Sequence, residues 1–126
     1  MCDRRRLPLL PSTLVTAALL AGCGPAQPAP RAAAPRGTIG VSLLALDNPF
    51  FKVIGDTIAA EAARQGFHTV VVSADKDVAR QGNQIKDFIV KKAAAIVMSP
   101  CDSKSIVPVI REANAAGIPV FTVDIP

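Results

Sequence analysis

The sequence has 126 residues, which leaves room for one folded domain at most. Its 14 basic and 10 acidic side chains give a net charge of +4, which falls to +2 from Cys23 onward because three arginines and one aspartate precede that cysteine. The remaining Lys and Arg are scattered among acids, with no basic stripe and no interleaved aromatic residues. The composition therefore argues against a nucleic-acid partner.

Residues 1–22 show the three parts of a bacterial signal peptide. Arginines at 4–6 form the basic start, residues 7–20 form the apolar stretch, and Leu20-Ala21-Gly22-Cys23 resembles the lipobox of bacterial lipoproteins at each position. The apolar stretch is shorter than the roughly 20 residues that a membrane-spanning helix needs, and it contains two prolines. We therefore expect an exported protein, lipid-anchored through Cys23 to the cell membrane and facing the periplasm or the cell exterior.

Residues 23–37 combine the lipidated cysteine with a segment rich in proline and alanine. Such a composition buries little apolar area and favours extended polyproline II, so the segment is predicted to be a tether. Lipidation also limits which cysteines could form a disulfide. Cys2 lies in the leader and Cys23 is modified, so Cys101 is expected to be left without a partner. No disulfide is expected, although the compartment would permit one.

From residue 38 onward, short apolar runs alternate with amphipathic stretches, which is typical of βα units around a parallel sheet. The predicted strands are residues 38–46, 70–72, 95–98 and 120–123. Three helices are predicted between them: one from an Asn48-Pro49 start to about Gln65, one after an Asp77 cap, and one within 103–116. Right-handed crossovers place these helices on both faces of one open sheet, so residues 38–126 are predicted to form a single α/β unit.

Helical periodicity predicts which side chains pack against the sheet. The first two helices each present one apolar stripe, made of Phe51, Ile54, Ile58 and Ala62 and of Ile85, Phe88 and Ile89. The three valines at 70–72 are typical of a strand buried on both faces. Pro108 lacks an N–H, so regular helix is expected to begin near Ser105 or to be distorted at the proline.

Ligands of open parallel sheets bind beyond the carboxyl ends of the strands, and this rule selects the candidate site residues. Following the four strands in order, they are Asp47, Asn48, Phe50 and Phe51, then Ser73 and Asp75, then Ser99, Cys101 and Asp102, and finally Asp124. Phe50 and Phe51 point about 100° apart on a helix and cannot share one inward stripe, so at least one of them is predicted to face a ligand. Asn48 and Asp102 are equally suited to capping helices, and Asp124 is otherwise a surface acid.

Four segments resemble the ribose-binding-protein family of periplasmic sugar binders, in that family's order and spacing. They are Leu46-Asp47-Asn48-Pro49-Phe50-Phe51, Asp77-Val78-Ala79-Arg80-Gln81, Ser99-Pro100-Cys101-Asp102-Ser103 and residues 115–124. The resemblance covers nearly all of residues 38–126. It implies part of the N-terminal lobe of a solute-binding protein that passes a sugar to the permease subunits of an ABC importer, with no enzymatic activity and no cofactor.

The resemblance also implies roles for the residues at matching positions. Asn48 would hydrogen-bond sugar hydroxyls, Phe50 and Phe51 would flank the sugar ring, and Asp124 would accept from two adjacent hydroxyls. Such a set suits a ligand with polar edges and C–H faces. Leu44 and Ile125 depart from the ribose binder, which has serine and arginine there, so a sugar-like ligand is expected rather than ribose itself.

Other classes of function fit the sequence less well. A dinucleotide enzyme would need a glycine-rich turn after the first strand, and residues 44–48 contain no glycine. A lactose-repressor-type effector domain shares the fold, but such regulators begin with a DNA-binding motif. Neither a metal at His68 nor a reactive thiol at Cys101 is expected, because neither has suitable neighbours in sequence. A sensing role beside a chemoreceptor or sensor kinase stays open. Residues 24–126 alone are not expected to bind sugar measurably, since half of the pocket would be missing.

Overall fold

The computed structural model describes residues 34–124. The predicted signal peptide, the lipidation site at Cys23, most of the predicted tether and Ile125 lie outside the described residues. Seven elements alternate along the chain: β1 (Thr38–Leu43), α1 (Pro49–Arg64), β2 (His68–Ser73), α2 (Val78–Val90), β3 (Ala95–Met98), α3 (Val107–Ala115) and β4 (Val120–Thr122). Within residues 34–124, no helix combines the length and the apolar character that crossing a bilayer requires.

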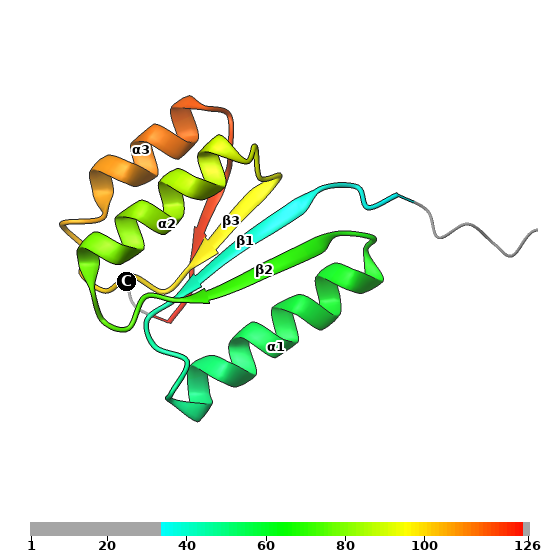
Figure 1. Cartoon of the computed structure of the whole chain (residues 1–126), viewed down its shortest axis with the longest axis horizontal. Helices are drawn as coiled ribbons and strands as arrows, with labels where there is room; N and C mark the ends of the chain where they lie inside the picture. The colour runs from blue at the N-terminus through cyan, green and yellow to red at the C-terminus, as the bar shows by residue number, and fades with distance from the viewer. Residues whose placement is uncertain (1–33, 125–126) are drawn as a thin grey trace, which may run out of the picture. The chain divides into compact units, whose positions relative to one another are not determined.

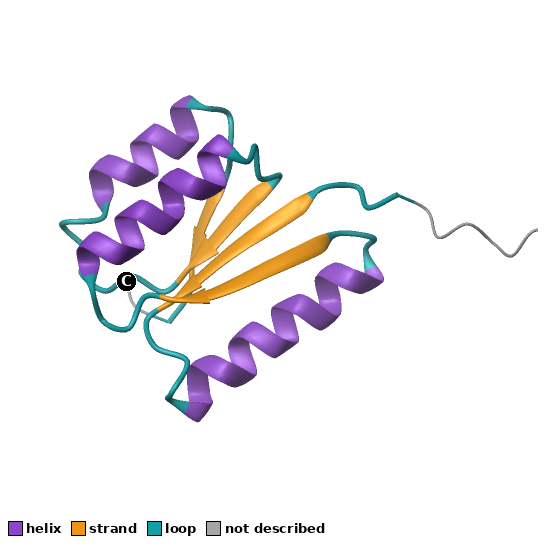
Figure 2. Cartoon of the chain, in the orientation of Figure 1, coloured by secondary structure: helices purple, strands orange, loops and turns teal. Residues whose placement is uncertain are grey.

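The four strands form one sheet in the order β2-β1-β3-β4, and every neighbouring pair is parallel. Helix α1 packs on β1 and β2 from one face, whereas α2 and α3 lie side by side on the opposite face (Figure 1 and Figure 2). This arrangement confirms the predicted α/β class, an open parallel sheet with helices on both faces. Strands β2 and β4 are the edges of the described sheet.

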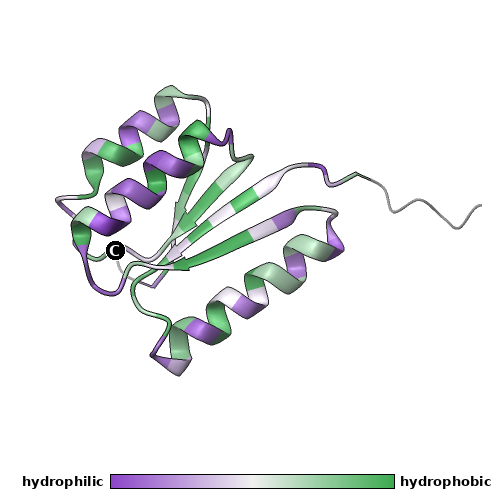
Figure 3. Ribbon diagram, in the orientation of Figure 1, coloured by the Kyte–Doolittle hydropathy of each residue, from purple (hydrophilic) through white to green (hydrophobic). Residues whose placement is uncertain are grey.

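Two apolar clusters hold the layers together, one on each face of the sheet. The cluster under α1 contains Val41, Leu43 and Phe51. The larger cluster lies under α2 and α3 and consists of Ile85, Phe88, Ala93, Ile96, Met98, Ile106, Val109, Ala113 and Ile118. Figure 3 shows the same division, with hydrophobic strands between helices whose outer faces are hydrophilic. Burial of this apolar surface is the main force that fixes the helices to the sheet.

The predicted inward stripes of the first two helices are confirmed. Phe51 and Ala62 are buried while Ile54 and Ile58 are half-buried in α1. Ile85 and Phe88 are buried and Ile89 is half-buried in α2.

The predicted helix starts are confirmed as well. The Asn48 Oδ1 atom accepts a hydrogen bond from the Phe50 N–H at 3.0 Å, and Pro49 is the first residue of α1. The Asp77 Oδ1 atom accepts from the Arg80 N–H at 2.9 Å at the start of α2. Gly66, with a φ of +80°, follows the end of α1 in the left-handed conformation that glycine adopts without strain.

Two element boundaries and the burial of one strand differ from the sequence predictions. Strand β1 ends at Leu43 rather than at residue 46, because residues 44–46 are buried as a loop: Ala45 is buried and Leu46 packs against the cluster under α1. The valines at 70–72 are half-buried, since β2 is an edge strand. Helix α3 begins at Val107, so Pro108 falls in its first turn, where the missing N–H removes no helical hydrogen bond.

Candidate functional site

All the loops that carry the predicted site residues leave the same edge of the sheet. Because the four strands are parallel, their carboxyl ends meet there, and Figure 1 shows the arrowheads converging. We call this edge the rim; it comprises the loop residues 44–48 with the first two residues of the following helix, and residues 74–77, 99–106 and 123–124. The register places Ser42 opposite Met98 and Met98 opposite Thr122, so the strands end at nearly the same level.

The start of α1 carries three of the predicted site residues: Asn48, Phe50 and Phe51. The Asn48 side chain is exposed, and only its Oδ1 atom is occupied within the described chain, by the Phe50 N–H. The two rings meet edge to face, with centroids 5.3 Å apart and planes at 75°. Phe50 is 53 % exposed, whereas Phe51 is 5 % exposed and packs against Val41 and Leu43. Phe50 therefore offers a ring to the solvent, and Phe51 ties the start of the helix to the sheet.

Asp124 lies on the same rim, at the end of β4. Val123 fixes its position, because the Val123 N–H donates to the Met98 carbonyl at 2.9 Å and the Val123 side chain packs against the cluster under α1. The Asp124 carboxylate is exposed, and its backbone has a left-handed φ of +76°. Strands β1 and β4 flank β3, so their ends lie about 10 Å apart. The structure thus brings Asp124 to the edge that carries Asn48 and Phe50, but two strands away from them.

A buried polar network lies directly beneath the rim. Gln81 on α2 is fully buried; its Nε2 atom donates to the Ser99 carbonyl at 2.8 Å, and its Oε1 atom accepts from the Cys101 N–H at 2.8 Å. Gln84, one turn later, accepts from the Ser42 hydroxyl at 2.8 Å and donates to the Ser73 carbonyl at 2.8 Å. One face of α2 therefore holds the ends of three strands in place.

The loop after β3 contains the other predicted rim residues. Asp102 Oδ1 accepts from the Ser105 N–H at 2.7 Å, so Asp102 caps the turn before α3 rather than α3 itself, whose first flanking residue, Ile106, has no side-chain cap. Hydrogen bonds from the Ser105 side chain, and then from its backbone, lower the pKa of Asp102. Burial, and then the charge of Asp77, raises the pKa of the Cys101 thiol, which keeps it protonated at neutral pH.

Ser99 sits in the middle of the rim, directly after β3. Its hydroxyl oxygen is buried, and it has no hydrogen-bond partner among the described residues. Within residues 34–124, no three His, Cys, Asp or Glu side chains gather as a metal-binding group.

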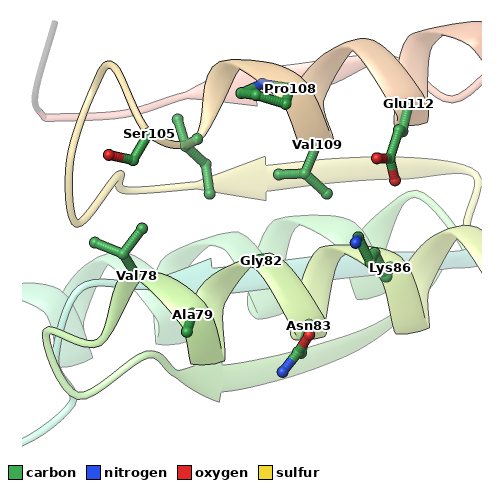
Figure 4. A pocket seen from close by; sticks show the side chains of 10 residues that line it. Val78, Ala79, Gly82, Asn83, Lys86, Ser105, Pro108, Val109 and Glu112 are labelled. Carbon is green, nitrogen blue, oxygen red and sulfur yellow. The ribbon is translucent and has the colours of Figure 1, made fainter.

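A groove of about 320 Å³ lies between α2 and α3 on the outer face of the molecule. Figure 4 shows its walls, with Val78, Gly82 and Lys86 on the α2 side and Ser105, Val109 and Glu112 on the α3 side. Asn48, Phe50, Phe51 and Asp124 do not line it. The groove is therefore a junction between two helices that shares Ser105 and Ile106 with the rim but none of the predicted ligand-binding residues.

Comparison with known proteins identifies the family of this chain. Residues 39–126 match the family described as periplasmic binding protein domain. The chain belongs to this family. Among curated periplasmic relatives, it is 37 % identical over 87 residues to the ribose import binding protein of Bacillus subtilis, an alignment that covers 69 % of this chain and 28 % of the relative. It is 40 % identical over 78 residues to a D-apiose import binding protein of Paraburkholderia graminis, covering 62 % of this chain and 25 % of that one.

Solved structures of periplasmic binding proteins show the same likeness. An ABC transporter solute-binding protein from Mycobacterium smegmatis with bound glycerol superposes with a TM-score of 0.67 at 36 % identity, covering 71 % of this chain and 31 % of that chain. A Bacillus halodurans solute-binding protein with bound myo-inositol gives a TM-score of 0.64 at 31 % identity, with the same two coverages. The chain thus spans about a quarter to a third of the length of these relatives.

Sequence reasoning missed the polar network of this periplasmic binding protein. Gln81 lies four residues before Ile85, in line with the inward stripe of α2, and a glutamine in that place was the available signal. Its partners, the Ser99 carbonyl and the Cys101 N–H, are backbone groups of a distant loop. No sequence pattern identifies such partners.

Proposed function

We propose that this chain is part of a solute-binding component of an ABC importer and contributes one wall of a site for a sugar or sugar-like ligand. The observation that carries the proposal is the exposure of Asn48, Phe50 and Asp124 on one rim. The names of the relatives support it, since those proteins are described as ribose and D-apiose import binding proteins.

The chemistry of these side chains suits a polyhydroxylated ligand. An exposed carboxylate at Asp124 accepts hydrogen bonds from two neighbouring hydroxyls, and such charge-assisted bonds are stronger than neutral ones. The free amide nitrogen of Asn48 donates to a hydroxyl oxygen. The Phe50 ring provides an apolar surface for the C–H face of a sugar, and the edge-to-face contact with the buried Phe51 ring supports it.

Further parts of the proposal follow from the sequence. The protein captures its ligand without chemical change, is exported through the leader at 1–22, and is anchored by a lipid on Cys23. Its partners are then the sugar, the permease subunits of the importer and the membrane reached through the lipid. Residues 38–126 are then part of the N-terminal lobe of the sugar-binding domain.

A thermal-shift screen of the complete natural protein against pentoses, hexoses and polyols tests the proposal. A ligand that binds only the folded state raises the melting temperature, so at least one sugar is expected to do so. Asp124→Ala and Asn48→Ser are each expected to weaken binding about 5- to 150-fold, the effect of losing one or two hydrogen bonds to the ligand. Serine keeps the helix cap, so the second variant removes the amide without unfolding the start of α1.

Asp87→Ala is the matched control, because Asp87 is an exposed acid on α2 away from the rim. Its affinity is expected to equal that of the parent protein. Unchanged affinity in both rim variants would remove Asn48 and Asp124 from the site, and a screen without any stabilising sugar would refute the proposed ligand class.

A further inference from the structure

The loop that carries Asn48 is fastened to the loop between β2 and α2. The Leu43 carbonyl accepts from the Ala74 N–H at 2.8 Å, and the Leu44 carbonyl accepts from the Lys76 N–H at 2.9 Å. The Leu46 N–H donates to the Ser73 hydroxyl oxygen at 3.1 Å. The first two bonds join backbone groups, whereas the third depends on a side chain. Of these three bonds between the loops, only the one to the Ser73 hydroxyl can be removed by changing a side chain.

The Ser73 hydroxyl has a fixed orientation. It donates its single proton to Asp75 Oδ1, and the other oxygen of that carboxylate pairs with the Arg80 guanidinium. Because the proton points to Asp75, the two lone pairs of the hydroxyl oxygen are left to accept from the Leu46 N–H at 3.1 Å and from the Asp75 N–H at 3.3 Å. Asp75, held by Arg80, thus orients the Ser73 hydroxyl so that one lone pair of its oxygen faces residues 44–48.

The backbone of the turn after β2 makes this arrangement possible. Asp75 and Lys76 both have left-handed φ angles, +51° and +63°, a conformation that side-chain-bearing residues adopt at a cost. The turn brings the Asp75 carboxylate back onto Ser73 and directs the Lys76 N–H at Leu44. A strained turn that is kept by bonds to the neighbouring loop indicates that the two loops are set as a unit.

We propose that Ser73, oriented by Asp75 and Arg80, is a positioning residue for the ligand site. Its hydroxyl sets the path of residues 44–48 and hence the places of Asn48 and Phe50, without contact to the ligand. This inference rests on the proposed function for its effect on affinity. Its effect on the loop does not depend on any ligand.

The backbone of Ser73 is secured independently of its hydroxyl. Ser73 pairs with Leu43 in the sheet, and its carbonyl accepts from Gln84 Nε2 at 2.8 Å. Removing the hydroxyl by Ser73→Ala therefore leaves β2 in place. It frees the Leu46 N–H, and it also removes the two bonds that Ser73 makes to the backbone N–H and the carboxylate of Asp75 within its own turn. Ser73→Thr retains a hydroxyl at the same position and serves as the conservative rescue.

The test measures amide hydrogen exchange by NMR and sugar affinity by calorimetry in the complete protein. In Ser73→Ala, exchange at Leu46 is expected to rise at least about tenfold and affinity to fall about three- to tenfold, while Ser73→Thr restores both. Thr57→Ala is the matched control, because the Thr57 hydroxyl bonds only the Val53 carbonyl within the exposed side of α1. It is expected to change neither quantity.

Each other result contradicts a definite part of the inference. Faster exchange at Leu46 with unchanged affinity would show that the fastening does not set the site. Weaker affinity with unchanged exchange would show that Ser73 touches the ligand, and would overturn the positioning role. If no sugar binds the parent protein, the proposed function fails, and the exchange measurement alone decides whether Ser73 holds the loop.

Discussion

Among single residues, Gly40 marks the closest approach between the sheet and α2. A Cβ atom added there would lie 2.5 Å from the Cδ2 and Cγ atoms of Phe88, whose ring is buried. Gly40→Ala is expected to lower the free energy of unfolding by about 1 to 3 kcal/mol, because the ring must leave its packed position. Urea denaturation measures the change.

Gly82 provides the control for the Gly40 prediction. It lies within α2, and a Cβ added there would meet nothing within 4 Å. Gly82→Ala is expected to raise the stability by about 0.5 to 1 kcal/mol through helix propensity alone. If Gly40→Ala raised the free energy of unfolding as much as Gly82→Ala, that result would contradict the close packing of Phe88 against Gly40.

The role of a single site residue could be predicted where it depends only on neighbouring residues in the sequence. A cap such as Asn48 acts on a backbone group two residues away, so its role follows from a short stretch of sequence. Helical periodicity placed Phe51 in the inward stripe, and its burial confirms that part of the prediction, but the sequence did not show how far Phe50 would be exposed. That exposure depends on the direction in which α1 lies on β1, which only the packed structure determines.

Among secondary-structure elements, α2 organises the rim through its buried glutamine. Gln81→Leu fills a similar volume but leaves the Ser99 carbonyl and the Cys101 N–H without partners in a buried place. Each unpaired backbone group costs about 1 to 3 kcal/mol, so the two groups together are expected to lower the free energy of unfolding by about 2 to 6 kcal/mol. Urea denaturation followed by circular dichroism measures it.

Gln65→Leu is the control for the Gln81 prediction. Gln65 is exposed at the end of α1, where its side chain bonds only Glu61 within the described chain. The substitution is expected to change the stability by less than about 0.5 kcal/mol. Equal effects of the two substitutions would show that the buried network contributes nothing particular to the fold.

Hydrophobic periodicity predicted which helices and strands form, but it predicted where they begin and end less accurately. Residues 44–46 continue the apolar run of β1, but their burial comes from the cluster under α1 and not from strand pairing. The valines of β2 gave no sign that their strand is an edge, because strand order is a property of the whole sheet. Pro108 predicted a helix start near Ser105 or a distortion at the proline, but α3 begins at Val107, two residues after Ser105, with the proline in its first turn.

Across the whole molecule, topology separates the rim from the point where the chain enters the sheet. Alternating strands and helices predicted parallel strands, and parallel strands place all the carboxyl ends at one edge. Residues 34–37 lead into β1 at its amino end, while Asn48 follows its carboxyl end. Since β1 has six residues, the two edges are about 20 Å apart.

This separation predicts that membrane anchoring and ligand binding are independent. The proposed lipid on Cys23 precedes in sequence the residues that enter the sheet at the edge opposite the rim, so Cys23→Ser is expected to abolish palmitate labelling and release the protein from membranes. The sugar affinity of the released protein is expected to stay within about twofold of the anchored form, because no rim residue changes its surroundings. Cys101→Ser is the matched control and should remain labelled. Labelling that persists in Cys23→Ser would refute the anchor, and a large loss of affinity on release would show that the membrane-proximal segment contributes to the site.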